Sequence, residues 1–150
     1  MTTIYFVCHG NICRSPAAEY IFKQLIEERR LSDLFEVDSF ALTREEIGNG
    51  VYLPMKRALE KKGIPFGNHR AKLLTAADVE KADYIFYMDE ENEWLIHRYF
   101  GSSSKFRPIY WKTSNIREIE DPWYTGRYDL VVRQIQECVE NLLKELSAQH

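Results

Sequence analysis

The opening of the chain constrains the fold more than any other segment. Residues 3–8 are a short and almost continuously apolar run, which is typical of a strand buried on both faces of a parallel sheet. A loop follows, and then an apolar stripe recurs at helical spacing through Ala17, Ala18, Ile21, Phe22, Leu25 and Ile26. We expect Ser15 to cap this helix and Pro16 to be its first residue.

The remaining chain repeats the alternation of strand and helix, which predicts an α/β protein with helices on both faces of a parallel sheet. Pro108 favours an edge position for the last strand, because proline cannot donate a ladder hydrogen bond. The expected segments are strands over 35–40, 82–88 and 106–110, and helices over 54–63, 75–81, 90–98 and 130–146.

Length and composition bound the class of protein. The 150 residues correspond to a single domain, 1–150. A net charge of −3 argues against a general nucleic-acid binder. No stretch approaches the roughly 20 apolar residues that span a bilayer, and no charged signal-peptide region precedes the first apolar run. With only three cysteines and no disulfide framework, we expect a cytoplasmic protein without membrane contact.

The loop after the first strand has the spacing C-x5-R, from Cys8 to Arg14. Gly10 and Asn11 are the residue types that most readily adopt positive φ, and such turns aim successive N–H groups inward as an anion nest. The following helix adds its positive end, and Arg14 can hold two phosphate oxygens. The predicted phosphate-binding residues are His9, Gly10, Asn11, Ile12, Cys13 and Arg14, with the His9 side chain pointing away.

Cys8 lies at the base of this predicted nest. The field that binds phosphate also favours a thiolate, and a thiolate facing a bound phosphate is a nucleophile. The alternative is a buried structural cysteine beside a surface arginine. The strand–loop–helix context favours catalysis by a cysteine-dependent phosphatase. No metal or cofactor is needed, because Arg14, the nest and the helix end carry the phosphate charge.

The segment VCHGNICRSP resembles the signature C-x-G-N-x-C-R-S-P of the low-molecular-weight protein tyrosine phosphatases. The resemblance continues through VDSFALT, NHRAKLLTAADVEKADYIFYMDEEN and IEDPWYTG. It implies a three-layer, doubly wound, four-stranded parallel sheet flanked by helices, with the phosphate loop after strand 1. It also implies a protein-tyrosine phosphatase that hydrolyses phosphotyrosine monoesters through a cysteinyl-phosphate.

The stretch EIEDPWYTG offers a proton donor. Asp121 precedes a proline, which holds it in an extended or turn conformation, and the resemblance assigns it as general acid and then base. Glu118 and Glu120 are rivals, and a simple Asp-Pro turn is the alternative. Trp123 and Tyr124 are expected to form an aromatic wall beside the substrate ring, one exposed and one partly buried.

The resemblance further implies a network that supports the strained loop, formed by Asn11, Ser15, Ser39 and His69. Two segments depart from the family pattern. Ser39 is followed by Phe-Ala-Leu-Thr where the family often has Ala-x-Thr, and residues 43–54 read TREEIGNGVYLP where many members carry a specificity-loop aromatic. The residue that forms the wall opposite Trp123 is therefore not assigned, with Ile47 and Tyr52 as the candidates.

The other cysteines have different predicted roles. Cys13 lies in the same loop as Cys8 and is a possible redox partner that forms a reversible disulfide. A metal site built on Cys8, His9 and Cys13 is disfavoured, because a single C-x4-C is poor zinc spacing. Cys138 lies on an apolar helical stripe and is expected in the core.

Three other functions are compatible with a loop of this kind, and each would require features that this sequence lacks or would have lost features that it keeps. An arginine phosphatase of the same superfamily would have threonine in place of Ile12 and small residues in place of the two aromatics. An arsenate reductase would need two further cysteines downstream, and a binding module would be expected to lose Cys8 or Asp121. The implied partner is a tyrosine-phosphorylated protein, with a bacterial-type tyrosine kinase or its targets as candidates. The chain is expected to be a monomer or weak dimer.

Overall fold

A four-stranded parallel sheet forms the centre of the computed structural model, which describes residues 1–150. Its strand order is β2-β1-β3-β4, with every neighbouring pair parallel. The strands are β1 (Thr2–Cys8), β2 (Phe35–Ala41), β3 (Tyr84–Tyr87) and β4 (Phe106–Pro108). The predicted α/β class is confirmed, and the strand that contains Pro108 lies at the edge as expected.

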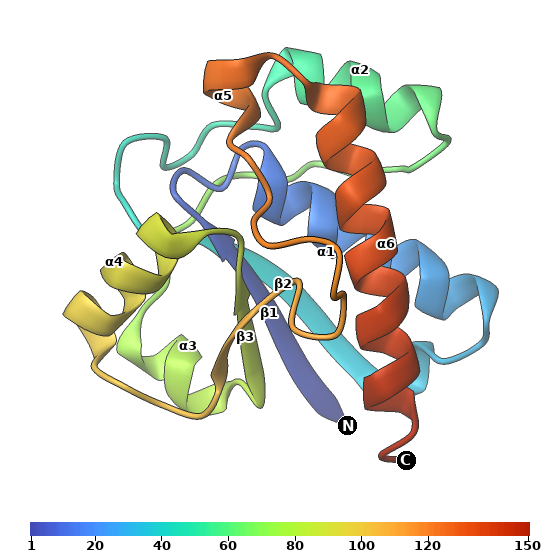
Figure 1. Cartoon of the computed structure of the whole chain (residues 1–150), viewed down its shortest axis with the longest axis vertical. Helices are drawn as coiled ribbons and strands as arrows, with labels where there is room; N and C mark the ends of the chain where they lie inside the picture. Colours follow the sequence, from blue (N-terminus) through green and yellow to red (C-terminus); the bar gives the residue numbers. More distant parts are fainter.

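Helices cover both faces of the sheet. The helical segments are α1 (Arg14–Glu28), η1 (Ser32–Leu34), α2 (Leu53–Lys61), α3 (Ala76–Lys81), α4 (Glu90–Phe100), α5 (Pro122–Thr125) and α6 (Tyr128–Ser147). Helices α1 and α6 pack together on one face, and α3 and α4 lie on the other (Figure 1). The one-turn helix α5 was not predicted; Pro122 occupies its first position and Gly126 ends it with φ of 72°.

The strands' alternating side chains divide the core in two. From β1, Ile4, Phe6 and Cys8 join the larger cluster beneath α1 and α6, whereas Tyr5 and Val7 join the smaller cluster on the α3 and α4 side. This alternation follows from the two-residue period of a strand. It places Cys8 at the end of β1, on the face covered by α1.

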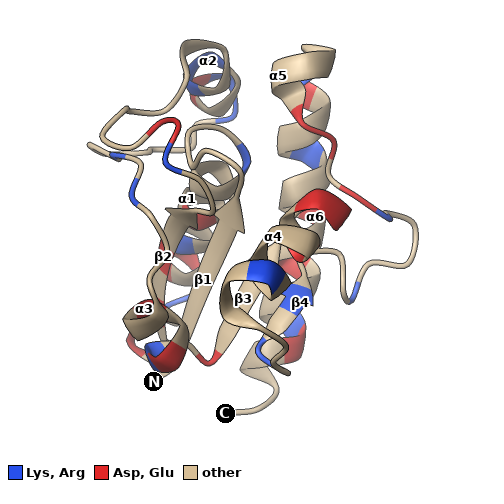
Figure 2. Ribbon diagram, turned by 90° about the vertical axis from the view of Figure 1, so that its left-hand side faces the viewer, with Lys and Arg blue, Asp and Glu red and all other residues tan.

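The carboxyl ends of the strands point toward α2 and α5 (Figure 1). Ligands of such sheets bind at this end, and charged residues occupy the loops there as well as the outer helix faces (Figure 2). None of the helices combines the length and the apolar character that a membrane crossing requires.

Helix α1 begins earlier than predicted. It starts at Arg14, with Cys13 in the N-cap position and no side-chain cap. The prediction that Ser15 caps the helix is wrong, because the Ser15 hydroxyl lies inside the first turn and bonds to Cys8 and Asn11 instead.

Candidate active site

The loop between β1 and α1 holds its shape through one strained residue. Asn11 has φ of 62°, whereas Gly10 is not among the residues with positive φ. Gly10 has a different requirement: a Cβ there would lie 3.2 Å from Cγ of Glu46. The backbone N–H groups of His9, Gly10, Ile12 and Cys13 donate to no acceptor within the protein. They remain available to an anion.

Cys8 is buried, with 3% of its surface exposed, and two groups contact its sulfur. The Asn11 N–H donates to Cys8 Sγ (3.3 Å), and Ser15 Oγ lies 3.0 Å from the same atom. Asn11 Nδ2 already donates to Ser15 Oγ (2.8 Å), so the serine's own hydrogen is free to point at the sulfur. Both donors therefore stabilise negative charge on Cys8.

A buried network fixes Asn11 in its left-handed conformation. Its Nδ2 donates to Ser39 Oγ as well as to Ser15, and its Oδ1 accepts from the Lys72 N–H (3.2 Å). Ser39 in turn donates to Glu19 Oε1 (2.6 Å). Three of the four residues expected to support the loop, Asn11, Ser15 and Ser39, thus meet at one point. Glu19 was missed, although a glutamate on the buried face of the first helix could have signalled it.

His69 completes the network from the segment before β3. Its Nε2 lies 2.7 Å from the Asn11 carbonyl oxygen, which can only accept, so Nε2 carries the hydrogen. Burial lowers the pKa of His69, although the Asn11 carbonyl and the Glu19 carboxylate act in the opposite direction. A neutral imidazole with hydrogen on Nε2 satisfies this geometry.

Arg14 lies at the entrance to α1, with 3% of its side chain exposed. Its Nη1 donates to Asp89 Oδ2 (2.7 Å) and to the Ile119 carbonyl (2.9 Å). Asp89 lies just after β3, at the carboxyl end of the sheet, and also caps α4 through the Asn92 N–H (2.8 Å). Sequence reasoning missed Asp89, even though acidic residues directly after a central strand are a signal for this edge.

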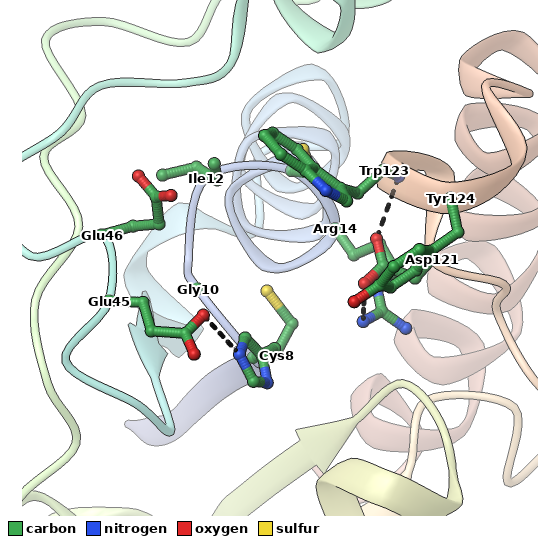
Figure 3. Close-up of a pocket in the computed structure, with 11 residues that line it drawn as sticks. Cys8, Gly10, Ile12, Arg14, Glu45, Glu46, Asp121, Trp123 and Tyr124 are labelled. Atoms are coloured by element: carbon green, nitrogen blue, oxygen red, sulfur yellow. Dashed lines mark hydrogen bonds and ion pairs between the residues drawn. The ribbon is translucent and has the colours of Figure 1, made fainter.

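Asp121 lies beside Arg14 at the cavity (Figure 3). Its Oδ2 lies 3.6 Å from Arg14 Nη2, and its Oδ1 accepts from the Trp123 N–H (3.0 Å), which caps α5. The two rival carboxylates turn elsewhere: Glu118 accepts from the Glu90 N–H, and Glu120 pairs with Arg127. Of the three, Asp121 alone lines the cavity.

These groups enclose a cavity of about 170 Å³, shown in Figure 3. Its lining residues are Cys8, His9, Gly10, Ile12, Cys13, Arg14, Glu45, Glu46, Asp121, Trp123 and Tyr124. The small volume and the sulfur at the base suit a single phosphoryl group and part of the group that carries it.

The cavity walls correct two predictions. Trp123 and Tyr124 both line the cavity, but both are exposed, at 54% and 84%, so neither is partly buried in the core. Tyr52 packs against Trp123 with its ring tilted by 48° and the ring centroids 4.9 Å apart, and so lies on the same side. The opposite wall is formed by Glu45 and Glu46 rather than by Ile47, which does not line the cavity.

The wall segment is tied to the phosphate loop. The N–H groups of Leu42, Thr43 and Tyr52 donate to the carbonyls of Cys8 (3.0 Å), His9 (3.1 Å) and Ile12 (2.9 Å). The His9 side chain does not point away from the site: it lies at the mouth between Glu45 and Glu91. Loop and wall therefore form one hydrogen-bonded unit.

All three cysteines are free and buried. Burial, together with the charge of Cys8, raises the pKa of the Cys13 thiol, and burial raises the pKa of Cys138 to about 12. Cys138 lies in the larger core cluster, as predicted. No group of three His, Cys, Asp or Glu side chains is arranged to hold a metal ion.

The comparisons with known proteins agree with this geometry. Residues 3–150 match the sequence model of the family described as low molecular weight phosphotyrosine protein phosphatase. The low molecular weight protein-tyrosine-phosphatase YfkJ of Bacillus subtilis is 33% identical, covering 97% of this chain and 96% of its own. The human low molecular weight phosphotyrosine protein phosphatase is 32% identical, with 95% and 94% covered.

Solved structures share the whole fold. The crystal structure of YfkJ superposes with a TM-score of 0.93 at 32% identity, covering 99% of this chain and 96% of its own. The YwlE arginine phosphatase of Bacillus subtilis superposes with a TM-score of 0.87 at 27% identity, covering 97% and 96%. That structure is of a cysteine-to-serine mutant with a phosphorylated active-site serine.

Proposed function

The chain belongs to the low molecular weight phosphotyrosine protein phosphatase family, and from this premise we propose that it hydrolyses phosphotyrosine in proteins through a cysteinyl-phosphate. Cysteine-dependent protein-tyrosine phosphatase activity follows from the family; the covalent route and the residue roles are our proposal. The observation that carries it is that Cys8, Arg14 and Asp121 line one cavity of phosphate size.

In the first step the Cys8 thiolate attacks phosphorus. The S–P bond forms as the bond from phosphorus to the tyrosyl oxygen breaks, and Asp121 gives its proton to that oxygen. The phosphoryl oxygens would bind the unpaired N–H groups of the loop and the guanidinium of Arg14. Charge stabilisation of this kind is usually the largest contribution to catalysis.

In the second step water hydrolyses the cysteinyl-phosphate. The oxygen of that water attacks phosphorus while the Asp121 carboxylate accepts one of the water's protons. The S–P bond breaks at the same time and returns the Cys8 thiolate. The Ser15 hydroxyl, 3.0 Å from the sulfur, stabilises the departing thiolate. A related arginine phosphatase carries a phosphoryl group on the serine of its cysteine-to-serine mutant, which supports a covalent route.

Two features favour phosphotyrosine over phosphoarginine as the substrate. Ile12 gives the loop a bulky apolar residue that lines the cavity. Trp123, supported by the Tyr52 ring, offers an aromatic surface for a phenyl ring. Tyrosine-phosphorylated proteins are therefore the proposed partners, with a bacterial-type tyrosine kinase or its targets as the candidates to test.

The testing experiment measures hydrolysis of matched phosphotyrosine, phosphoserine and phosphoarginine peptides in EDTA. We expect turnover of phosphotyrosine that Cys8→Ser abolishes and Asp121→Asn lowers by about 100-fold or more. Glu120→Asn is the matched control, since its carboxylate pairs with Arg127 outside the cavity, and it should stay close to wild type. Faster turnover of phosphoarginine would contradict the substrate assignment, and activity in Cys8→Ser would contradict the covalent route.

A further inference from the structure

The wall of the cavity opposite Trp123 is acidic, and this charge is held in fixed positions. Resting on the proposed function, we propose that Glu45 and Glu46 select phosphotyrosine substrates that carry a lysine or arginine next to the phosphotyrosine. Both glutamates line the cavity, and in Figure 3 they lie on the opposite side of the phosphate loop from Trp123.

Glu46 is positioned by contacts on both sides. Its Cγ packs over Gly10 of the phosphate loop, where no Cβ intervenes. Its Oε2 accepts a hydrogen bond from Asn49 Nδ2 (2.7 Å). Because the partner is a neutral amide, the full negative charge of Glu46 remains at the wall.

Glu45 is held by His9. His9 Nε2 lies 2.8 Å from Glu45 Oε2, and His9 Nδ1 lies 3.1 Å from Glu91 Oε1. Three carboxylates, those of Glu45, Glu46 and Glu91, therefore accompany one imidazole. Because a single ring can carry at most one positive charge, this side of the mouth is net negative whichever form of His9 is present.

No free cation offsets that charge inside the cavity. Arg14 is the only lysine or arginine in the lining, and it is already matched by Asp89 and Asp121. Arg127, which follows α5, is paired with Glu120. Arg44 borders a separate apolar depression beside Tyr99. The groups that can bind an anion, which are Arg14 and the unpaired N–H groups of the loop, therefore lie only at the base, where the phosphoryl group binds.

The consequence for a substrate follows from this separation of charge. The phosphoryl group reaches the positive base and the tyrosyl ring lies against Trp123, so the peptide on either side of the tyrosine must cross the mouth. A neighbouring lysine or arginine gains from Glu45 and Glu46, whereas a glutamate meets like charge. Exposed pairs of this kind each change binding by about two- to fivefold.

The test compares kcat/KM for phosphotyrosyl peptides that differ only in whether lysine or glutamate flanks the tyrosine, on each side in turn. In wild type we expect the lysine peptide to be favoured by about tenfold on at least one side. The ratio should fall to within about twofold in the Glu45→Gln, Glu46→Gln double variant and invert in Glu46→Lys. High salt should also reduce it.

Glu137→Gln is the matched control, because it removes one negative charge from an exposed position on α6 outside the cavity lining. It should keep the wild-type ratio. A ratio near one in wild type, or a tenfold ratio that survives in the double variant, would overturn this inference while leaving phosphotyrosine hydrolysis intact. Absence of any Cys8-dependent phosphotyrosine turnover would instead overturn the proposed function, and this inference with it.

Discussion

Ser39 donates a hydrogen bond to the buried carboxylate of Glu19 (2.6 Å) while accepting one from Asn11 Nδ2 (3.0 Å). Through this pair of contacts, a charge on α1 fixes which way the Ser39 hydroxyl points. The orientation of Asn11, and therefore of the whole phosphate loop, depends on a residue that does not line the cavity.

Glu19→Gln tests that dependence. The amide loses the charge-assisted bond to Ser39, so we expect the free energy of unfolding to fall by about 1–3 kcal/mol and kcat/KM to fall with it. Urea denaturation and aryl phosphate hydrolysis measure the two effects. Lys23→Gln is the control: Lys23 pairs with the same carboxylate from a half-exposed position (2.5 Å), so its loss should cost under about 1 kcal/mol. An equal loss of unfolding free energy in the two variants would contradict the idea that the Glu19–Ser39 contact orients the loop.

The positive φ of Asn11 predicts a difference between two substitutions. Asn11→Gly and Asn11→Ala both remove the side-chain bonds to Ser15 and Ser39, so both should lower kcat. Only alanine must also bear the cost of a left-handed backbone at φ of 62°, which makes it about 1 kcal/mol less stable than the glycine variant. Thermal unfolding of the pair measures this difference, and equal stability would argue against strain at this residue.

Asp89→Asn separates two functions of one side chain. Asparagine still caps α4, so stability should change little, but the charged bond to Arg14 (2.7 Å) is lost. We expect KM for an aryl phosphate and the inhibition constant of inorganic phosphate to rise by about tenfold, as for one charge-assisted hydrogen bond. Asp89→Ala, which also removes the cap, should add a loss of stability. An unchanged inhibition constant in Asp89→Asn would show that Arg14 does not need this partner.

The buried His69 predicts an acid limit to stability. Burial lowers its pKa in the folded protein, so the unfolded chain binds the proton more readily. The stabilising contribution is therefore complete above the ordinary histidine pKa and is lost as pH falls through it toward the folded value, with a slope of at most about 1.4 kcal/mol per pH unit. Unfolding measured from pH 7.5 to 5 should show this loss, and His69→Gln should show a shallower slope.

Cys13 predicts a reversible response to peroxide. Its burial and raised pKa keep it a thiol until Cys8 is oxidised to a sulfenic acid, whose hydroxyl leaves as water when the two sulfurs join. Intact mass should show a loss of two hydrogens in wild type, with activity restored by a thiol reductant. In Cys13→Ser, Cys8 should instead be oxidised irreversibly, so the mass should rise by added oxygen and a thiol reductant should not restore activity. Wild type that gains only oxygen would contradict the pairing.

Local patterns were sufficient for most of the fold and for the base of the site. The buried strand at 3–8, the apolar stripe of α1 and the C-x5-R spacing each depend on neighbouring residues. In the structure Cys8 ends β1 and Arg14 begins α1, and both line the same cavity. Asp121 lies more than 100 residues away, and its position was inferred from family resemblance. The Asp-Pro pair by itself indicated only a turn.

The missed features depend on contacts between distant segments. Asp89, Glu19 and the acidic wall at Glu45 and Glu46 acquire their partners only when β1, β3 and the loop after β2 meet at one edge of the sheet. The prediction that Ser15 caps α1 was wrong for a related reason. The Ser15 hydroxyl bonds to the sulfur of Cys8 and the side-chain amide of Asn11 instead of to the N-terminus of the helix. At a functional site, polar side chains often bond to the groups that bind the ligand, even where local preference would place them in a helix cap.

The hydrogen bonds that join residues 42–52 to the phosphate loop have a thermodynamic consequence for ligands. The carbonyls of Cys8, His9 and Ile12 are occupied before any anion arrives, and Asn11 is fixed by its own side chain. Binding of an oxyanion therefore orders little additional backbone. Because this entropic cost is small, most of the favourable free energy of the contacts contributes to affinity. Calorimetry of a small tetrahedral oxyanion should accordingly show binding without a large unfavourable entropy of ordering.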